Sequence, residues 1–414
     1  MFTLLFIAFL IADIIFRFWL DSRQLRHVQK HRNTVPDEFS DRIGLHSHQR
    51  AADYTSAKIQ LSIVERIVEA AVLVAMTLLG GLQILDVQLG QLIEHEMLRQ
   101  LALVGSVMAI LGIVSLPFSI WRKFKLEARY GFNRMTPGLF FQDAIKTLII
   151  SLVLGTPLLA GILWVMSHTG TNWVWWAWGI WVAFNFLVLW LFPTVIAPLF
   201  NKFTPLNDPE MADRIHALAK RCGFSLGGLF VMDGSRRSAH GNAYFTGFGK
   251  ARRIVFFDTL LSRLNIDEIE AVLAHELGHF KHRHIIKRMV ISFSLALVFL
   301  LLLGWLSTQV WFYTDLGVLP QLGRPNDALA LILFFLVMPV FTFWATPLTS
   351  WMSRRDEFQA DDYAASQCSS SHLISALVKL YDDNAATLTP DPVHSAFYDS
   401  HPPAVLRIQH LKHG

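Results

Sequence analysis

Residues Ala271-Val-Leu-Ala-His-Glu-Leu-Gly-His-Phe280 place two histidines four positions apart, with a glutamate directly after the first. In a helix, residues four apart lie on the same face, so His275 and His279 can offer two imidazole nitrogens to one metal ion. Glu276 points about 100° further round the helix, which suits a base that takes a proton from the attacking water better than a third ligand. The stretch predicts the zinc site of a protease.

The flanking residues favour a helix with separate metal and packing faces. Asn265 is a suitable N-cap, and Glu268 follows three residues later, as in a capping box. Apolar side chains form a stripe roughly opposite the two histidines: Ile269, Leu273, Leu277 and Phe280.

The composition indicates an integral membrane protein. Of the 414 residues, 53% are hydrophobic and only 16% are charged, with 13 Trp and 32 Phe, so the chain is too apolar for an ordinary soluble enzyme. The formal net charge is +4, but the basic residues cluster beside apolar runs, and we expect no nucleic-acid partner. Cys222 and Cys368 are far apart, which indicates neither a disulfide framework nor a cysteine zinc site.

Seven apolar runs are long enough to span a membrane, and the first is interpreted as a retained anchor. Within it, Asp13 and Arg17 lie four apart and are expected to pair with each other. The predicted fold is a mainly α-helical multi-pass membrane protein with seven transmembrane helices. The predicted spans lie at 1–20, 61–85, 99–121, 144–166, 173–199, 289–313 and 328–350.

Basic residues between the spans predict the orientation. Segments 21–60 and 121–143 carry seven and five Lys or Arg, whereas 86–98, 167–172 and 314–327 carry only Arg324. By the positive-inside rule the N-terminus lies outside and the site faces the cytoplasm. We therefore divide the chain into spans one to five with their loops (1–199), the first part of a metalloprotease domain (200–288), spans six and seven (289–350), and the second part of that domain (351–414).

Segment 200–264 predicts a helix near 208–222 and three short strands, 229–232, 243–246 and 254–257, separated by Gly-rich turns. A small sheet beside the metal helix could hold an extended peptide along its edge by backbone hydrogen bonds. Ala243 and Tyr244 are therefore candidate substrate-binding residues. A plain structural hairpin is the alternative.

A catalytic zinc needs a third protein ligand. The metzincin pattern would require Gly at 282 and His at 285, which this chain lacks, whereas Glu357 follows the seventh span and Asp361 lies one helical turn further on. Glu357 is the predicted ligand, and Asp361 the predicted acceptor from a histidine N–H. His282 and His284 compete as ligands, but they do not share a helical face and are interpreted as a solvated basic flank.

The sequence resembles the type I CAAX prenyl proteases, which are integral-membrane zinc endopeptidases, over nearly its whole length. The motifs that carry the resemblance, besides the HELGH at 275–279, are Tyr130-Gly-Phe-Asn-Arg134, Pro198-Leu-Phe-Asn-Lys-Phe-Thr-Pro-Leu206, Asn242-Ala-Tyr-Phe245, Ser353-Arg-Arg with Glu357 and Asp361, and His401-Pro-Pro403. The fold that it implies is seven tilted helices around a large water-filled chamber, closed on the cytosolic side by the metalloprotease domain.

The resemblance also implies roles for residues that spacing alone does not single out. Asn242 and His401 resemble the groups that flank the zinc and stabilise the oxyanion, and Arg407 follows the His-Pro-Pro motif as a further candidate substrate-binding residue. The expected cofactor is one Zn²⁺ per chain. The expected partners are membrane lipid and a peptide or protein substrate, with prenylated C-terminal CAAX peptides among the candidates.

The C-terminal Leu-Lys-His-Gly contains no obvious endoplasmic-reticulum retrieval signal, and we expect a bacterial inner membrane. Three other functions are alternatives to a CAAX prenyl protease. An intramembrane site-2-type protease would carry its metal helix inside a span, and a membrane quality-control metalloprotease would have fewer spans. A transporter or receptor with a structural zinc would need no base at Glu276.

Overall fold

Membrane-length helices dominate the computed structural model, which describes residues 1–246, 253–321 and 323–413. Within those ranges, six stretches are long and apolar enough to cross a membrane, and a bent pair supplies a seventh. The six are Phe2–Lys30 (α1), Glu96–Glu127 (α4 and the π-helix η1), Pro137–His168 (α5), Gly170–Phe200 (η2, α6, the π-helix η3 and α7), His284–Leu306 (α11) and Asp327–Gln367 (α13, η6 and α14). These stretches agree with the seven predicted spans.

The second predicted span, 61–85, is not one continuous helix. It is divided between α2 (Leu45–Met76) and α3 (Gly81–Leu92), which are bent by 54°. Gly80 adopts a left-handed φ of 75°, and a Cβ at Gly81 would lie 2.6 Å from the carbonyl oxygen of Ala75. The two glycines permit a turn that other residues would resist, so the run breaks despite its apolar character.

The last two spans also differ from their predicted limits. The predicted span 289–313 ends as a helix at Leu306, and the short α12 (Val310–Thr314) follows. The span 328–350 consists of α13 (Asp327–Thr342), a 3₁₀ turn at Phe343–Ala345 (η6) and the start of α14 (Thr346–Gln367). The helix that carries Glu357 is thus a direct extension of the seventh span.

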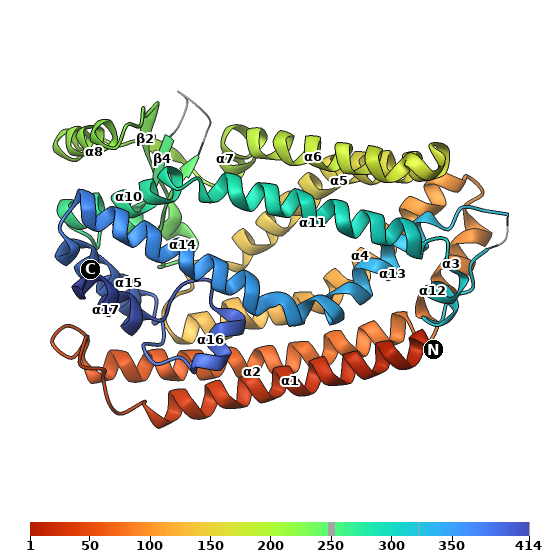
Figure 1. Cartoon of the computed structure of the whole chain (residues 1–414), viewed down its shortest axis with the longest axis horizontal. Helices are drawn as coiled ribbons and strands as arrows, with labels where there is room; N and C mark the ends of the chain where they lie inside the picture. The colour runs from red at the N-terminus through yellow and green to blue at the C-terminus, as the bar shows by residue number, and fades with distance from the viewer. Residues whose placement is uncertain (247–252, 322, 414) are drawn as a thin grey trace.

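Segments predicted to share one side of the membrane lie at the same end of the molecule. Phe132, between the third and fourth spans, stacks on His240 of the polar segment with ring centroids 4.6 Å apart. At the other end, the Ser167 hydroxyl donates to Asp327 at 2.7 Å. Figure 1 shows β2, β4, α10, α15 and α17 at one end and the N-terminus at the other. The polar segments on both sides of the last two spans therefore meet.

The polar segments contain a four-stranded sheet in the order β1-β2-β4-β3. The predicted strands correspond to β2 (Gly228–Met232), β3 (Ala243–Thr246) and β4 (Arg253–Phe257); β1 (Phe203–Pro205), three residues long and ending in proline, was not predicted. β2 and β4 are parallel, and β3 runs antiparallel to β4 at the edge of the sheet. The predicted helix near 208–222 is α8 (Pro209–Arg221).

A hydrophobic core that joins both polar segments surrounds α10 (Ile266–Lys281). Ile269, Leu273 and Leu277 of the predicted stripe are each 1% exposed, and they pack with residues of the sheet, α14, α15 (Ser370–Asp383) and α17 (Ala404–His413). The remaining short elements are η4 (Gly234–Arg236), α9 (Asp258–Leu261) and α16 (Pro392–Tyr398).

The membrane helices enclose a cavity of about 1440 Å³, lined by residues of α4, α5, α6, α11, α13 and α14. Most of its wall is apolar, but Arg283, Lys287, Arg288 and Asp356 line its end beside α10. The predicted chamber is thus present. The predicted intramembrane pair is also present, with Arg17 Nε donating to Asp13 Oδ1 at 2.8 Å.

The start of α10 is held by a buried glutamate. Asn265 and Glu268 form the predicted capping box, and Glu268 also accepts from Lys379 Nζ and the Ser375 hydroxyl, both at 2.7 Å. Burial by itself would raise the pKa of the Glu268 carboxyl, but hydrogen bonds from Lys379, the Asn265 backbone and Ser375 outweigh it and lower the pKa below 4.5. Because the folded state favours the ionised form, this carboxylate stabilises the fold above pH 4.5, and the contribution is lost as the pH falls through the lower folded pKa.

We predict that Glu268→Ala destabilises the polar domain by about 2 kcal/mol, because it removes a cap and charged hydrogen bonds. The measurement is the thermal unfolding midpoint of the detergent-solubilised protein. Glu268→Gln keeps the capping box and should lose less, and Glu210→Ala, an exposed glutamate in the first turn of α8, is the control. The difference between wild type and Glu268→Ala should shrink below pH 4.5. An unchanged midpoint at neutral pH would contradict this role.

Candidate metal centre and active site

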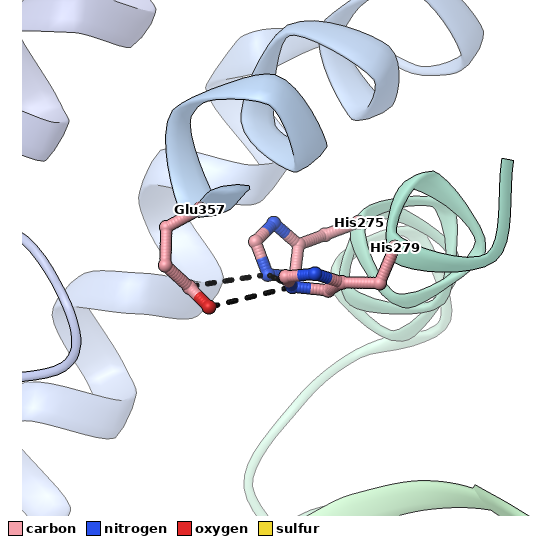
Figure 2. A group of neighbouring side chains, drawn as sticks. All are labelled: His275, His279 and Glu357. Carbon is pink, nitrogen blue, oxygen red and sulfur yellow. Dashed lines mark hydrogen bonds and ion pairs between the residues drawn. The ribbon is translucent and has the colours of Figure 1, made fainter. Parts of the chain in front are cut away.

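Two neighbouring helices bring His275, His279 and Glu357 together. His275 Nε2 lies 3.5 Å from Glu357 Oε2, and His279 Nε2 lies 3.4 Å from Glu357 Oε1. The two Nε2 atoms are 3.3 Å apart. In Figure 2 both rings of α10 turn toward the carboxylate of α14. One ligand atom from each residue lies within 4.8 Å of the others, a spacing at which all three can reach one ion.

A glycine allows α10 and α14 to approach this closely. A Cβ at Gly278 would lie 2.9 Å from Ala360 Cα and 3.0 Å from the Ala360 carbonyl oxygen. Both are backbone atoms, so no side-chain rotation could relieve the clash. The glycine of the HELGH stretch therefore sets the distance between the helix of the histidines and the helix of the glutamate.

Asp361 and Arg407 support the first histidine from behind. Asp361, which is fully buried, lies 2.8 Å from His275 Nδ1. Arg407 donates to both Asp361 oxygens, from Nε at 2.6 Å and from Nη2 at 2.7 Å. Since Arg407 is only 5% exposed, its guanidinium neutralises and orients Asp361, and its position does not favour the substrate contact expected from the sequence.

The charges around His275 oppose one another. Burial and the Arg407 guanidinium lower the pKa of His275, but the carboxylates of Asp361 and Glu357 outweigh them, and the net shift is upward. A metal ion at this position must therefore compete with a proton for the imidazole.

The three predicted catalytic residues, His401, Asn242 and Glu276, lie in different surroundings. His401 Nε2 is 3.6 Å from Glu357 Oε1, and 65% of the His401 side chain is exposed. Asn242 lies directly before β3, where its side chain accepts from the Ala243 N–H at 2.8 Å. Glu276 is half-buried on α10, and within the described ranges its carboxylate forms no hydrogen bond or ion pair.

The interpretation of His284 as part of a solvated flank is wrong. His284 is 1% exposed, and its Nδ1 lies 3.0 Å from Nδ1 of His279. Arg283 has a positive φ of 56°, which ends α10 at Lys281 and starts α11 at His284. Helical-face spacing does not apply across such a break, so no sequence pattern predicts this contact.

Strand β3 lies at the edge of the sheet and packs against the metal helix. Phe245 of β3 and Phe280 of α10 have ring centroids 5.2 Å apart. Ala243 and Tyr244 are the first residues of that edge strand, next to Asn242. The predicted small sheet beside the metal helix is therefore present.

The donor set suits a divalent metal. Two imidazoles and one carboxylate match the ligands of catalytic zinc sites. Glu357 Oε2 is buried and forms no hydrogen bond within the part of the chain that the structure describes. A buried carboxylate oxygen without a hydrogen bond is costly, and a cation between it and the imidazoles would satisfy it. Such a set, with its glutamate on a helix that continues a membrane span, indicates a membrane metalloendopeptidase.

Comparisons with known proteins agree with this class and narrow it to a family. Residues 24–202 match the family model described as CAAX prenyl protease N-terminal, five membrane helices, and residues 205–414 match Peptidase family M48. The chain belongs to the CAAX prenyl proteases of peptidase family M48. It is an integral multi-pass membrane protein and a metalloendopeptidase, and membership implies a metal centre.

Similar proteins match along almost their whole length. CAAX prenyl protease 1 homolog of Arabidopsis thaliana is 35% identical over 97% of this chain and 96% of its own, and CAAX prenyl protease 1 of Saccharomyces cerevisiae is 32% identical over 98% and 94%. The crystal structure of S. mikatae Ste24p superposes with a TM-score of 0.93 at 30% identity and covers 100% of this chain and 99% of that one. These relatives are eukaryotic, so they give no support to the expected bacterial inner membrane.

We predict that Gly278→Ala weakens metal binding about tenfold without unfolding the protein, because the added methyl group must push α14 and Glu357 away from the histidines. The measurement is the dissociation constant for Zn²⁺ by competition with a chelator. Gly112→Ala in α4 is the matched control, because nothing lies within 4 Å of the Cβ it would add. Unchanged affinity in Gly278→Ala would mean that the helix contact does not set the ligand distance.

Proposed function

We propose that the protein is a zinc-dependent endopeptidase in which His275, His279 and Glu357 hold the metal. The observation that carries this proposal is the convergence of their three ligand atoms from α10 and α14 within 4.8 Å of one another. When bound, zinc would lower the pKa of water to about 7 and polarise the scissile carbonyl. The Asp361 carboxylate would accept the Nδ1 proton of His275 and so keep Nε2 free as a ligand.

Glu276 is the proposed general base. It neighbours His275 on α10, outside the ligand set, and its carboxylate is free of hydrogen bonds to described residues. It would accept a proton from the attacking water and pass it to the leaving amine. The Asn242 amide and the His401 imidazole would donate to the developing oxyanion, each contributing about 3 kcal/mol.

The edge of the sheet is the proposed peptide-binding element. An extended substrate would add a strand beside β3, held by backbone groups of Ala243 and Tyr244. That placement would bring its carbonyl groups past Asn242 toward the histidines. The packing of Phe245 on Phe280 links the strand rigidly to the metal helix and supports this proposal.

Two observations favour a prenylated C-terminal CAAX peptide as substrate. The similar proteins are named CAAX prenyl proteases, and a mostly apolar cavity of about 1440 Å³ lies between the membrane helices, with Asp356, the sequence neighbour of Glu357, in its wall. A quality-control metalloprotease would have fewer spans than the six or seven candidate helices here. A structural zinc site in a transporter would not explain why a carboxylate with no hydrogen bond to a described residue, that of Glu276, lies beside the ligands.

We predict that Glu276→Gln retains zinc but lowers hydrolysis at least about 100-fold, because the ligands remain while the base is lost. Metal content and turnover are measured together, on a farnesylated CAAX peptide, on the same peptide without the lipid, and on an unfolded membrane protein. Glu357→Ala is the comparison and should lose zinc as well as activity. Hydrolysis near the wild-type rate in Glu276→Gln would refute the proposed base, and preference for the unfolded protein would favour a quality-control role.

We further propose that the end of the molecule with the metal ligands faces the cytoplasm, with 200–288 and 351–414 as two parts of one metalloprotease domain. The charge asymmetry of the loops supports this orientation, and the shared hydrophobic core around α10 supports the two-part domain. The compartment, a bacterial inner membrane in the sequence-based expectation, stays a prediction.

Single-cysteine labelling tests the orientation. In a background without Cys222 and Cys368, we expect cysteines at Ser167 and Arg324 to react with a membrane-impermeant reagent from outside, and those at Ser235 and Ser371 only after permeabilisation. All four side chains are exposed. The reverse pattern would invert the orientation, and labelling of 235 and 371 from opposite sides would exclude a shared site.

A further inference from the structure

A second buried histidine lies behind the proposed ligand His279. His284 Nδ1 is 3.0 Å from His279 Nδ1, on the side of that ring opposite the Nε2 that faces Glu357. His284 Nε2 in turn lies 3.0 Å from Gln359 Oε1 and 3.5 Å from Asp356 Oδ1. His284, at 1% exposure, is thus enclosed between α10 and α14 and contacts both.

If His279 binds a metal, the direction of each hydrogen bond from His279 through His284 to Gln359 follows. A neutral imidazole that binds a metal through Nε2 carries its proton on Nδ1. The Nδ1–H of His279 must then donate, and His284 Nδ1 is its acceptor. His284 consequently carries its own proton on Nε2, where Gln359 Oε1 accepts it. No other assignment satisfies both short contacts with His279 as an Nε2 ligand.

We propose that His284 is a positioning residue for His279, as Asp361 is for His275; this inference rests on the proposed metal site. The two supports differ in charge. Asp361 is a carboxylate neutralised by Arg407, whereas His284 is a neutral acceptor that donates to the neutral Gln359. The Asp356 carboxylate, 3.5 Å from His284 Nε2, is itself paired with Arg288. His284 orients the ring and selects its tautomer without adding negative charge next to the ion, so the metal keeps its power to polarise a carbonyl.

The contacts of His284 also reach the wall of the membrane cavity. Asp356, beside His284 Nε2, accepts from Arg288 Nη2 at 3.1 Å, and both residues line the cavity. His284 therefore lies between a metal ligand and the charged end of the chamber. A substitution at His284 is expected to change metal binding, because the proposed ligand His279 is the polar neighbour of His284 Nδ1.

The test compares three variants of the full-length protein in detergent. His284→Leu fills a similar volume but accepts no hydrogen bond. We therefore expect its dissociation constant for Zn²⁺ to be 10- to 100-fold larger than that of the wild type. His284→Asn places an amide oxygen near the former Nδ1 and should recover most of that loss. His216→Leu, at an exposed histidine of α8, is the control and should bind as wild type. The Co²⁺-loaded proteins give a second readout, because the visible absorption of Co²⁺ reports the ligand geometry, which should change only in His284→Leu.

His279→Ala, measured alongside, separates this inference from the proposed metal site. If His279→Ala retains tight metal binding, the ligand set itself is wrong. If His279→Ala loses the metal while His284→Leu keeps wild-type affinity and the wild-type Co²⁺ spectrum, the ligand set stands and the role of His284 is refuted. Equal losses in His284→Leu and His284→Asn would also overturn it, because the acceptor would then not matter. The unfolding midpoints of the metal-free variants show that the fold is retained.

Discussion

The contact between α10 and α14 is the constraint on which the rest of the site depends. Neither helix could hold the proposed metal alone, since one offers two imidazoles and the other a single carboxylate, and two membrane-length helices separate them in sequence. Gly278 lets the backbone of α10 lie against Ala360 of α14, and the distance between the donor atoms follows from that approach. The capping box and the Glu268 contacts to α15 hold the start of α10 in the core that both polar segments share.

Buried charge around this contact is arranged so that each group has a partner. Asp361 would be costly to bury alone, but Arg407 meets it with two hydrogen bonds and the His275 imidazole lies on its other side. Glu357 faces the two Nε2 atoms. Its Oε2 lies 3.7 Å from Arg407 Nη1 but forms no hydrogen bond to any described residue, so a cation would satisfy it. The site is therefore preorganised by its surroundings before any substrate arrives.

The membrane part supplies a compartment next to this polar centre. Its helices enclose a mostly apolar cavity, and charged residues gather only at the end beside α10. The seventh span continues directly into α14, so the element that forms part of the cavity wall also carries Glu357. A substrate with an apolar chain and a peptide end would find both environments on one continuous helix, which fits the substrate class that we propose.

Elements with local signals could be predicted from the sequence alone. The capping box at Asn265, the apolar stripe of α10, the β-strands at 229–232, 243–246 and 254–257, and the seven apolar runs all follow from patterns a few residues long, and the structure contains them. The proposed donor set could likewise be predicted from the HELGH stretch and Glu357, because only a few residue types bind zinc. Contacts that depend on the approach of distant segments could not be predicted from the sequence. Three features have no periodic signal in the sequence: the bend at Gly80, the ion pair of Arg407 with Asp361, and the contact of His284 with His279. They depend on backbone turns and on the packing of different helices.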